Sequence, residues 1–236
     1  MQRYFAKNIE NDKITLSNSD IHHIKNVMRM KENDMVEVVF DKKTYLCSLD
    51  NNLELHIESV INEDKELPKE IIAIIGLVKE QKMDLILQKL TELGVSKIIP
   101  VNMERSIVKL DSKREEKKLI RWQSICKEAS EQSKRSNVPI VREVVSLKEL
   151  IKIEADLKLV ASTKEKDKMF DYYLQNINNY AKIIMVVGPE GGINDREEEF
   201  LCNNNYNRVS FGDLIFRVET AAIYAASIFN FYGSKR

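Results

Sequence analysis

The stretch Ile-Ile-Met-Val-Val-Gly-Pro-Glu-Gly-Gly at residues 183–192 decides the fold of this chain. Its first five residues are apolar and mostly β-branched, which is typical of a strand buried on both faces of a parallel sheet. The glycines and the proline that follow predict a tight turn. Asn194, with Glu197 three residues later, has the pattern of a capping box and predicts the start of a helix. Strand, turn and helix together indicate an α/β domain.

The same alternation extends over residues 70–236. Buried or half-buried strands are predicted at residues 71–78, 98–101, 157–161, 183–187 and 208–210. Helices are predicted at residues 81–93, 113–133, 194–204 and 218–232. Gly94 is the expected stop of the first helix. We therefore expect an α/β domain over a mostly parallel sheet.

Residues 1–68 have a different pattern, because short strands dominate. These strands are predicted at residues 3–6, 13–16, 35–40, 44–49 and 53–60. One helix, capped by Ser19 or Asp20, interrupts them. The series predicts a small β-barrel, and the polar residues 62–69 form the expected linker. The predicted domains are thus residues 1–68 and 70–236.

Composition places the chain among soluble globular proteins, with 43% hydrophobic and 31% charged residues in 236. No apolar run is long enough for a membrane span, and the first residues lack the apolar core of a signal peptide. The three cysteines, Cys47, Cys126 and Cys202, are far apart and form no metal-binding pattern. We expect a cytoplasmic protein without a metal ion.

The net charge is zero, but the charges are unevenly distributed. Residues 69–136 carry 15 Lys or Arg against 10 Asp or Glu, whereas residues 1–68 carry 9 against 13. A basic middle segment is compatible with phosphate contact on a neutral molecule, and it is equally compatible with ordinary solvated helix faces.

Several common enzyme classes lack their motifs here. The chain has no GxxxxGK[ST] loop and no GxGxxG turn after a strand. Its three histidines, His22, His23 and His56, all precede the α/β domain, which argues against a Ser/His/Asp triad within that domain.

Two loops remain as candidates for a site. The first is Gly188-Pro189-Glu190-Gly191-Gly192 at a predicted strand end, where open α/β sheets bind ligands. Alone, it is equally well explained as a tight turn without a ligand. The second loop, residues 211–221, places Arg217, Glu219 and Thr220 where a buried helix should begin, and core packing does not explain such polar residues.

GPEGG, followed one strand later by G-x-x-I-x-R-x-E-T-A, resembles the SPOUT superfamily of knotted methyltransferases. Within it, the chain is similar to the family that methylates N3 of a uridine in 16S ribosomal RNA. Residues 79–105, 128–139 and 3–5 also match, so the resemblance spans nearly the whole chain. It implies a trefoil knot in the carboxy-terminal domain, preceded by a PUA-like β-barrel that docks RNA. It also implies a homodimer that acts on the small ribosomal subunit.

The resemblance implies S-adenosyl-L-methionine as the cofactor. Carried over by motif, its contacts fall on Gly188, Glu190, Gly191, Gly192, Leu214, Ile215, Phe216 and Thr220. Ser162 and Thr163, at the end of an earlier predicted strand, are expected to form a third wall of the same site. The family often has a basic residue at the position of Leu214, so a phosphate or substrate contact there is not carried over. Arg217 is then the main cationic candidate, expected to stabilise negative charge on the uracil carbonyls. Glu190 or Glu219 is the expected proton acceptor, although Glu219 could instead cap its helix or pair with Arg217.

RNA contacts are expected from basic and aromatic side chains in both domains. The candidates are Arg3, Tyr4, Arg29, Lys79, Lys82, Arg105 and Arg135. For each single basic residue, a solvated surface position is the competing interpretation. Two other functions compete with the enzyme: a non-catalytic RNA- or ribosome-binding protein that retains the fold, and a small-molecule enzyme that binds a nucleotide at the glycine loop.

Overall fold

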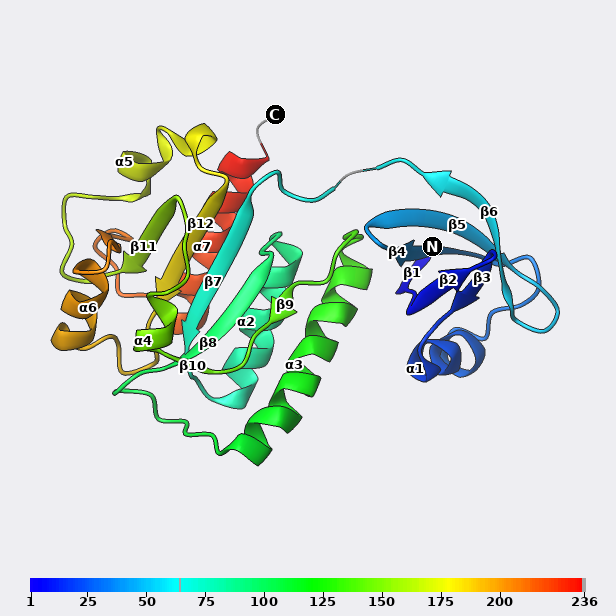
Figure 1. Cartoon of the computed structure of the whole chain (residues 1–236), viewed down its shortest axis with the longest axis horizontal. Helices are drawn as coiled ribbons and strands as arrows, with labels where there is room; N and C mark the ends of the chain where they lie inside the picture. The colour runs from blue at the N-terminus through cyan, green and yellow to red at the C-terminus, as the bar shows by residue number, and fades with distance from the viewer. Residues whose placement is uncertain (64, 235–236) are drawn as a thin grey trace. The chain divides into compact units, whose positions relative to one another are not determined.

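The computed structural model describes residues 1–63 and 65–234 and divides into two compact units (Figure 1). The N-terminal unit consists of Met1–Glu66 and Lys127–Val138. The C-terminal unit consists of Leu67–Cys126 and Pro139–Arg236. In the part of the chain that is described, no helix combines the length and the apolar character that a membrane crossing requires.

The N-terminal unit is built on a four-stranded sheet with the order β1-β4-β5-β6. Its strands are β1 (Gln2–Phe5), β4 (Met35–Phe40), β5 (Lys43–Leu49) and β6 (Leu55–Ile61). A separate hairpin is formed by β2 (Asn8–Glu10) and β3 (Lys13–Thr15), and a helical turn by α1 (Asn18–His22) and the π-helix η1 (His23–Val27). Tyr4, Val36, Val38 and Cys47 are fully buried in its core. The expected strands thus form a four-stranded sheet and a hairpin.

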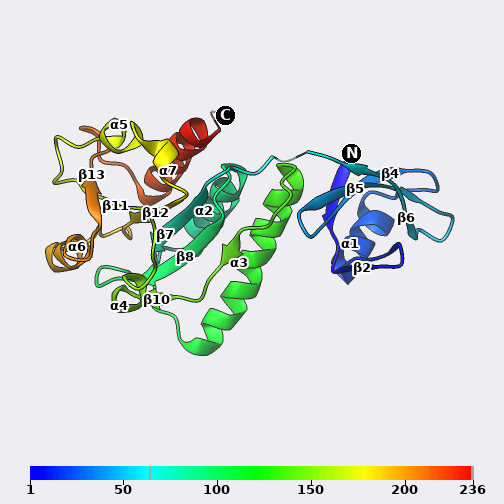
Figure 2. The ribbon, with the colours of Figure 1, turned by 45° about the horizontal axis from the view of Figure 1, so that its top comes forward.

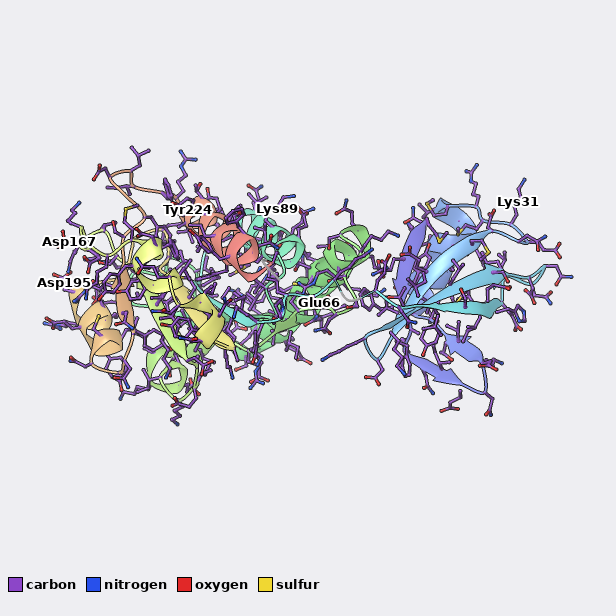
Figure 3. All side chains as sticks on the ribbon, turned by 90° about the horizontal axis from the view of Figure 1, so that it is seen from above. Lys31, Glu66, Lys89, Asp167, Asp195 and Tyr224 are labelled. Carbon is purple, nitrogen blue, oxygen red and sulfur yellow. The ribbon has the colours of Figure 1, made fainter. Side chains whose placement is uncertain are left out.

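The end of helix α3 (Ser112–Gln132) and the residues after it belong to this unit. The buried guanidinium of Arg3 donates to the carbonyls of Lys134 (2.6 Å) and Arg135 (2.9 Å). Arg135 in turn pairs with Glu66, labelled in Figure 3, at 2.6 Å. These bonds join the first strand to a segment more than 130 positions away in the sequence.

The C-terminal unit contains a seven-stranded sheet in which every recorded strand pair is parallel. The strand order is β10-β8-β7-β12-β11-β13, and β9 pairs with β8. The strands are β7 (Glu70–Gly76), β8 (Lys97–Asn102), β9 (Ile140–Val141), β10 (Val145–Ser146), β11 (Leu157–Ala161), β12 (Lys182–Val187) and β13 (Asn207–Val209). The mostly parallel sheet expected from the sequence is confirmed.

Helices cover both faces of this sheet, which explains why its central strands are apolar throughout. The helices are α2 (Glu80–Glu92), α4 (Leu147–Leu150), α5 (Phe170–Leu174), the 3-10 turn η2 (Ile177–Asn179), α6 (Asp195–Cys202) and α7 (Val218–Gly233). Ile71 and Ile75 of β7 face Leu90 of α2 and Phe229 of α7. The alternate residues of β7 pack against α4 and α6 on the other side. Figure 2 shows α2 and α7 together on one face.

The structure corrects one helix start and adds elements that the pattern did not reveal. Ser17, rather than Ser19 or Asp20, caps α1, since its Oγ accepts from the Asp20 amide at 3.1 Å. The short elements β2, β9, β10, α4, α5 and η2 were not expected, because two to five residues are too few to show a period. The trefoil knot stays a prediction.

Candidate functional site

Three neighbouring parallel strands, β13, β11 and β12, end at the same edge of the large sheet. The loops that follow them surround a cavity of about 430 Å³, within the range of small-ligand sites. Its walls include both loops expected from the sequence and the end of β11. Of the expected cofactor and catalytic residues, the cavity is lined by Ser162, Thr163, Gly188, Glu190, Gly191, Gly192, Leu214, Ile215, Phe216 and Arg217.

The first wall is the glycine-rich loop after β12. Its turn is closed by a hydrogen bond from the Gly192 amide to the Pro189 carbonyl at 2.8 Å, and Gly192 has a φ of +73°, which favours glycine. Gly76, at the end of β7, packs so closely that an added Cβ would lie 2.4 Å from the Pro189 nitrogen. Arg105 Nη1 donates to the Gly191 carbonyl at 3.3 Å. The loop is therefore held by the end of β7 and by the loop after β8.

A capping box fixes the helix after this loop, as the sequence predicts. Asn194 Oδ1 accepts from the Glu197 amide at 2.8 Å, and Glu197 Oε2 accepts from the Asn194 amide at 3.3 Å. The loop after β8 joins this box, because Asn194 Nδ2 donates to Glu104 Oε2 at 2.9 Å. The start of α6 and the cavity wall are thus one hydrogen-bonded unit.

The second wall is the loop between β13 and α7, and an aromatic cluster anchors it. Phe211 stacks on Phe170 with ring centroids 5.1 Å apart, and Phe216 packs edge-on against Tyr224 of α7 at 5.2 Å (Tyr224 is labelled in Figure 3). Between these anchors the loop reaches into solvent, since Leu214 and Ile215 are 75% and 84% exposed. Rigid ends and an apolar, accessible centre suit a loop that closes over a ligand.

The third wall, after β11, contains a buried ionic group. Ser162 Oγ donates to Glu198 Oε1 at 2.8 Å, and Arg208 Nε donates to the same oxygen at 2.5 Å. The hydrogen bond that Arg208 donates to Glu198 raises the pKa of Arg208. Thr163, next to Ser162, is exposed at the cavity.

Lys82 of α2 connects the two carboxylates expected to accept a proton. Its Nζ lies 2.9 Å from Glu190 Oε1 and 3.5 Å from Glu219 Oε2. The hydrogen bond to Glu190, and then the charge of Glu219, raise the pKa of Lys82. Glu219 Oε2 is buried and has no hydrogen-bond partner of good geometry in the described part of the chain. Glu219 therefore pairs with Lys82 rather than with Arg217.

Arg217 lines the cavity immediately before α7 begins, and its side chain is exposed. Within residues 1–63 and 65–234, no hydrogen bond or ion pair engages its guanidinium. Thr220 and Glu219, in the first turn of α7, are not among the lining residues, and Thr220 faces solvent. Arg217 is the exposed cation at the mouth of the cavity with no partner recorded in this part of the chain.

The residues expected to contact RNA have very different positions. Arg3, Tyr4 and Arg135 are 4%, 2% and 5% exposed, and the Tyr4 hydroxyl lies 3.0 Å from His23 Nδ1. Since their polar groups are used inside the N-terminal unit, we leave these three out of the RNA interface proposed below. Lys82 and Arg105 line the cavity, and Arg105, Arg29 and Lys79 are exposed.

Sequence reasoning missed several lining residues, of which Glu198 is the most informative. Glu198 lies in the acidic run 197–199, a pattern that is typical of an ordinary first helical turn. Phe211 and Gly76 were missed because their role is to hold a loop rather than to present a reactive group. Among the described residues no cluster of three or more His, Cys, Asp or Glu side chains could hold a metal ion.

The chain matches two models of known protein families. Residues 65–230 match the RNA methyltransferase domain, and residues 16–52 match the RNA methyltransferase PUA domain. The chain belongs to the RNA methyltransferase family. The first match covers most of the C-terminal unit, including all the loops that line the cavity.

Relatives in this RNA methyltransferase family are similar over nearly their full length. The chain is 35% identical to the ribosomal RNA small subunit methyltransferase E of Bacillus subtilis, covering 98% of this chain and 96% of the relative. It is 30% identical to the protein of the same name from Rickettsia conorii, covering 95% and 92%.

A solved structure has the same architecture. The ribosomal RNA small subunit methyltransferase E from Neisseria gonorrhoeae, bound to S-adenosylmethionine, superposes with a TM-score of 0.86. It is 30% identical, with coverage of 98% of this chain and 97% of that one.

Proposed function

We propose that this protein transfers a methyl group from S-adenosyl-L-methionine to N3 of a uridine in 16S ribosomal RNA of the small ribosomal subunit. The observation that carries the proposal is the cavity between the loops after β11, β12 and β13, with Arg217 at its mouth. The names of the relatives support ribosomal RNA of the small subunit as the substrate. Such a substrate also implies a cytoplasmic protein.

The cavity fits this cofactor by its size and by the chemistry of its walls. Phe216, Ile215 and Leu214 supply apolar surface for an adenine ring, and the glycine-rich loop exposes backbone groups without side chains in the way. Lys82 and Arg208 compensate the nearby carboxylates, so the cavity holds no uncompensated cluster of like charge. We propose Ser162, Thr163, Gly188, Glu190, Gly191, Gly192, Leu214, Ile215, Phe216 and Thr220 as the cofactor contacts.

In this proposal, different residues stabilise charge and accept a proton during methyl transfer. The bound cofactor supplies an electrophilic methyl group, and positioning accounts for much of the rate of such a transfer. Because N3 of uridine carries a proton, that proton has to leave. Arg217 would stabilise the negative charge that develops on the uracil carbonyl oxygens. Glu190 or Glu219, each paired with Lys82, would accept the proton.

RNA docking would involve both units. We propose the N-terminal unit, with Arg29, as an RNA-docking domain that corresponds to the predicted domain 1–68. Arg105 lines the cavity, and Lys79 shortly precedes Lys82, which also lines it. Both would contact phosphates next to the target nucleotide.

A homodimer is also part of the proposal. Ala222, Ala225 and Ala226 of α7 do not supply its interface, because they are buried against the sheet of the same chain. An interface through α7 would use its other face, where Phe231 is 61% exposed. Sedimentation at micromolar concentration checks this, and a monomer would refute it.

Labelled methyl transfer to isolated small subunits tests the function. Subunits come from a strain lacking this gene, and the product is mapped by reverse transcription, since a methyl group at N3 blocks base pairing and stops the enzyme. One new stop at a uridine, dependent on S-adenosylmethionine, is expected. Binding of the subunit without transfer would instead favour a non-catalytic RNA-binding protein.

A further inference from the structure

A second cavity lies entirely within the N-terminal unit. Its volume is about 410 Å³, comparable to that of the cofactor cavity. The β2–β3 turn, the α1–η1 helical turn and the start of β6 form its walls. Leu16, Ile24 and Leu55 are buried and form an apolar floor. Nothing in the proposed methyl transfer uses this cavity.

Two rare backbone conformations occur in its walls. Ile24 and Lys25 belong to a π-helix, a conformation that is uncommon and concentrated at functional sites. Leu53 has a φ of +64°, which is strained for a residue with a Cβ. Such conformations persist where the surrounding structure enforces them, and here both line the same cavity.

The rim of this cavity carries acidic side chains, basic side chains and one imidazole ring. Asp12 and Glu54 supply carboxylates, and Lys13 and Lys25 supply ammonium groups. All four are exposed, and none has a side-chain hydrogen bond or ion pair recorded within residues 1–63 and 65–234. The side chain of His56, which is 60% exposed, completes the rim. The rim therefore offers acceptors, donors and a flat surface.

We propose that this cavity binds one unstacked nucleobase of the RNA substrate, and that the base carries an exocyclic amino group. The site rests on the proposed function, because it names a second contact with the same RNA. An apolar floor takes a base face, and a histidine ring stacks on bases in RNA sites. Lysines at the rim reach the flanking phosphates.

The carboxylates decide which base is preferred. A carboxylate accepts a hydrogen bond from an amino group of cytosine, adenine or guanine, as in the pairing of Glu or Asp with the cytosine amino group. Uracil has no amino group, and its one N3–H donor lies between two carbonyl oxygens, so a carboxylate of Asp12 or Glu54 that accepts from it also lies close to two acceptors. The cavity thus selects against the base that the methyl-transfer site receives.

Methyl NMR on the full chain tests the site, with the δ1 methyls of Ile14, Ile21 and Ile24 as reporters of this cavity. The probes are the trinucleotides UCU and UUU and the mononucleotide CMP. UCU should shift these methyls with an affinity at least about fivefold higher than that of UUU, in line with one additional hydrogen bond. CMP should bind more weakly than UCU, because it carries only one phosphate where the cytidine of UCU is flanked by two. Ile193 and Ile215, which line the cofactor cavity, report binding there separately.

Matched variants separate the outcomes. Glu54→Ala should reduce the preference for UCU to within about twofold, since the amino group of the base then loses a carboxylate acceptor. Glu32→Ala, an exposed glutamate of the same unit outside the cavity, should leave it unchanged. Equal shifts with UUU, tighter binding of CMP than of UCU, or no shift at all would each overturn the proposal. Loss of methyl transfer with these shifts intact would refute the proposed function alone.

Discussion

Lys82 Nζ of α2 lies 2.9 Å from Glu190 Oε1 in the glycine-rich loop, so one ion pair joins a helix to the wall of the cofactor cavity. Glu219 at the start of α7 shares the same ammonium group at 3.5 Å. Two carboxylates therefore depend on a single cation. Since these carboxylates raise the pKa of Lys82, the lysine stays protonated and does not itself accept the proton of uridine.

Lys82→Met should slow methyl transfer by about tenfold, because Glu190 and Glu219 lose the ammonium group that holds them at the cavity. Single-turnover rates at saturating cofactor measure the effect. Lys82→Arg keeps a cation at this position and is the matched control, which should retain most of the wild-type rate. A wild-type rate in Lys82→Met would show that this ion pair does not position the proton acceptor.

Arg217→Ala should lower the rate of methyl transfer about 100-fold, in the range found when one group that stabilises an oxyanion is removed. Its guanidinium has no partner recorded among the described residues, so its loss should leave the fold intact. Calorimetry should accordingly find cofactor affinity within about twofold of wild type, as expected for a group that acts mainly in the transition state. A wild-type rate would exclude Arg217 from catalysis.

Gly76→Ala should weaken cofactor binding at least about tenfold, because the new Cβ would meet the backbone of Gly188 and Pro189, which cannot move without displacing the loop. Gly233→Ala is the matched control: its Cβ would lie 3.8 Å from the nearest atom, and alanine favours a helix. Calorimetry compares the two. Equal affinities in both variants would mean that the loop is not held in place by β7.

The N-terminal unit should lose stability in acid through Glu37. Burial raises the pKa of this carboxyl, but hydrogen bonds from Lys134 and Arg3 outweigh it and the pKa is lowered overall. A lowered folded pKa gives stability that is present above the unfolded value of about 4.3 and is lost as the pH falls through the folded value. The protection of the β1 and β4 amides against hydrogen exchange, relative to the intrinsic rate at each pH, should therefore fall below about pH 4.

Glu37→Gln should make the protection of the β1 and β4 amides less dependent on pH. At neutral pH the protection should be lower than in wild type, because the buried Arg3 loses its carboxylate. Glu32→Gln, on the surface of the same unit, should keep the wild-type dependence. An identical pH profile in Glu37→Gln and wild type would assign the acid sensitivity to another group.

Much of the C-terminal unit follows from local patterns in the sequence. The apolar residues of β12 mark a strand covered on both faces, and Asn194 with Glu197 marks the start of α6, because both signals lie within a few neighbouring residues. The two site loops were found for the same reason. Each combines unusual residue types with a predicted strand end.

Other features depend on partners far away in the sequence, and local patterns do not contain them. Arg3 and Tyr4 look like surface residues of a basic, aromatic N-terminus, yet carbonyl groups at positions 134 and 135 and the ring of His23 bury them. From the sequence, Lys82 is predicted to contact a phosphate, whereas in the fold it pairs with Glu190 and Glu219. Burial of a charged group is decided by tertiary partners, not by its neighbours in the chain.

The position of Lys127–Val138 in the N-terminal unit has a consequence for synthesis of the protein. The first 66 residues leave the ribosome well before the segment that completes their fold. At about 5–20 residues per second, the 72 residues from Leu67 to Val138 (138 − 66) take about 4–14 s to make. During that interval the guanidinium of Arg3 lacks the carbonyl groups of Lys134 and Arg135 to which it donates in the folded unit. A nascent chain that stops before residue 127 therefore carries an unfinished first domain, exposed to proteases and chaperones.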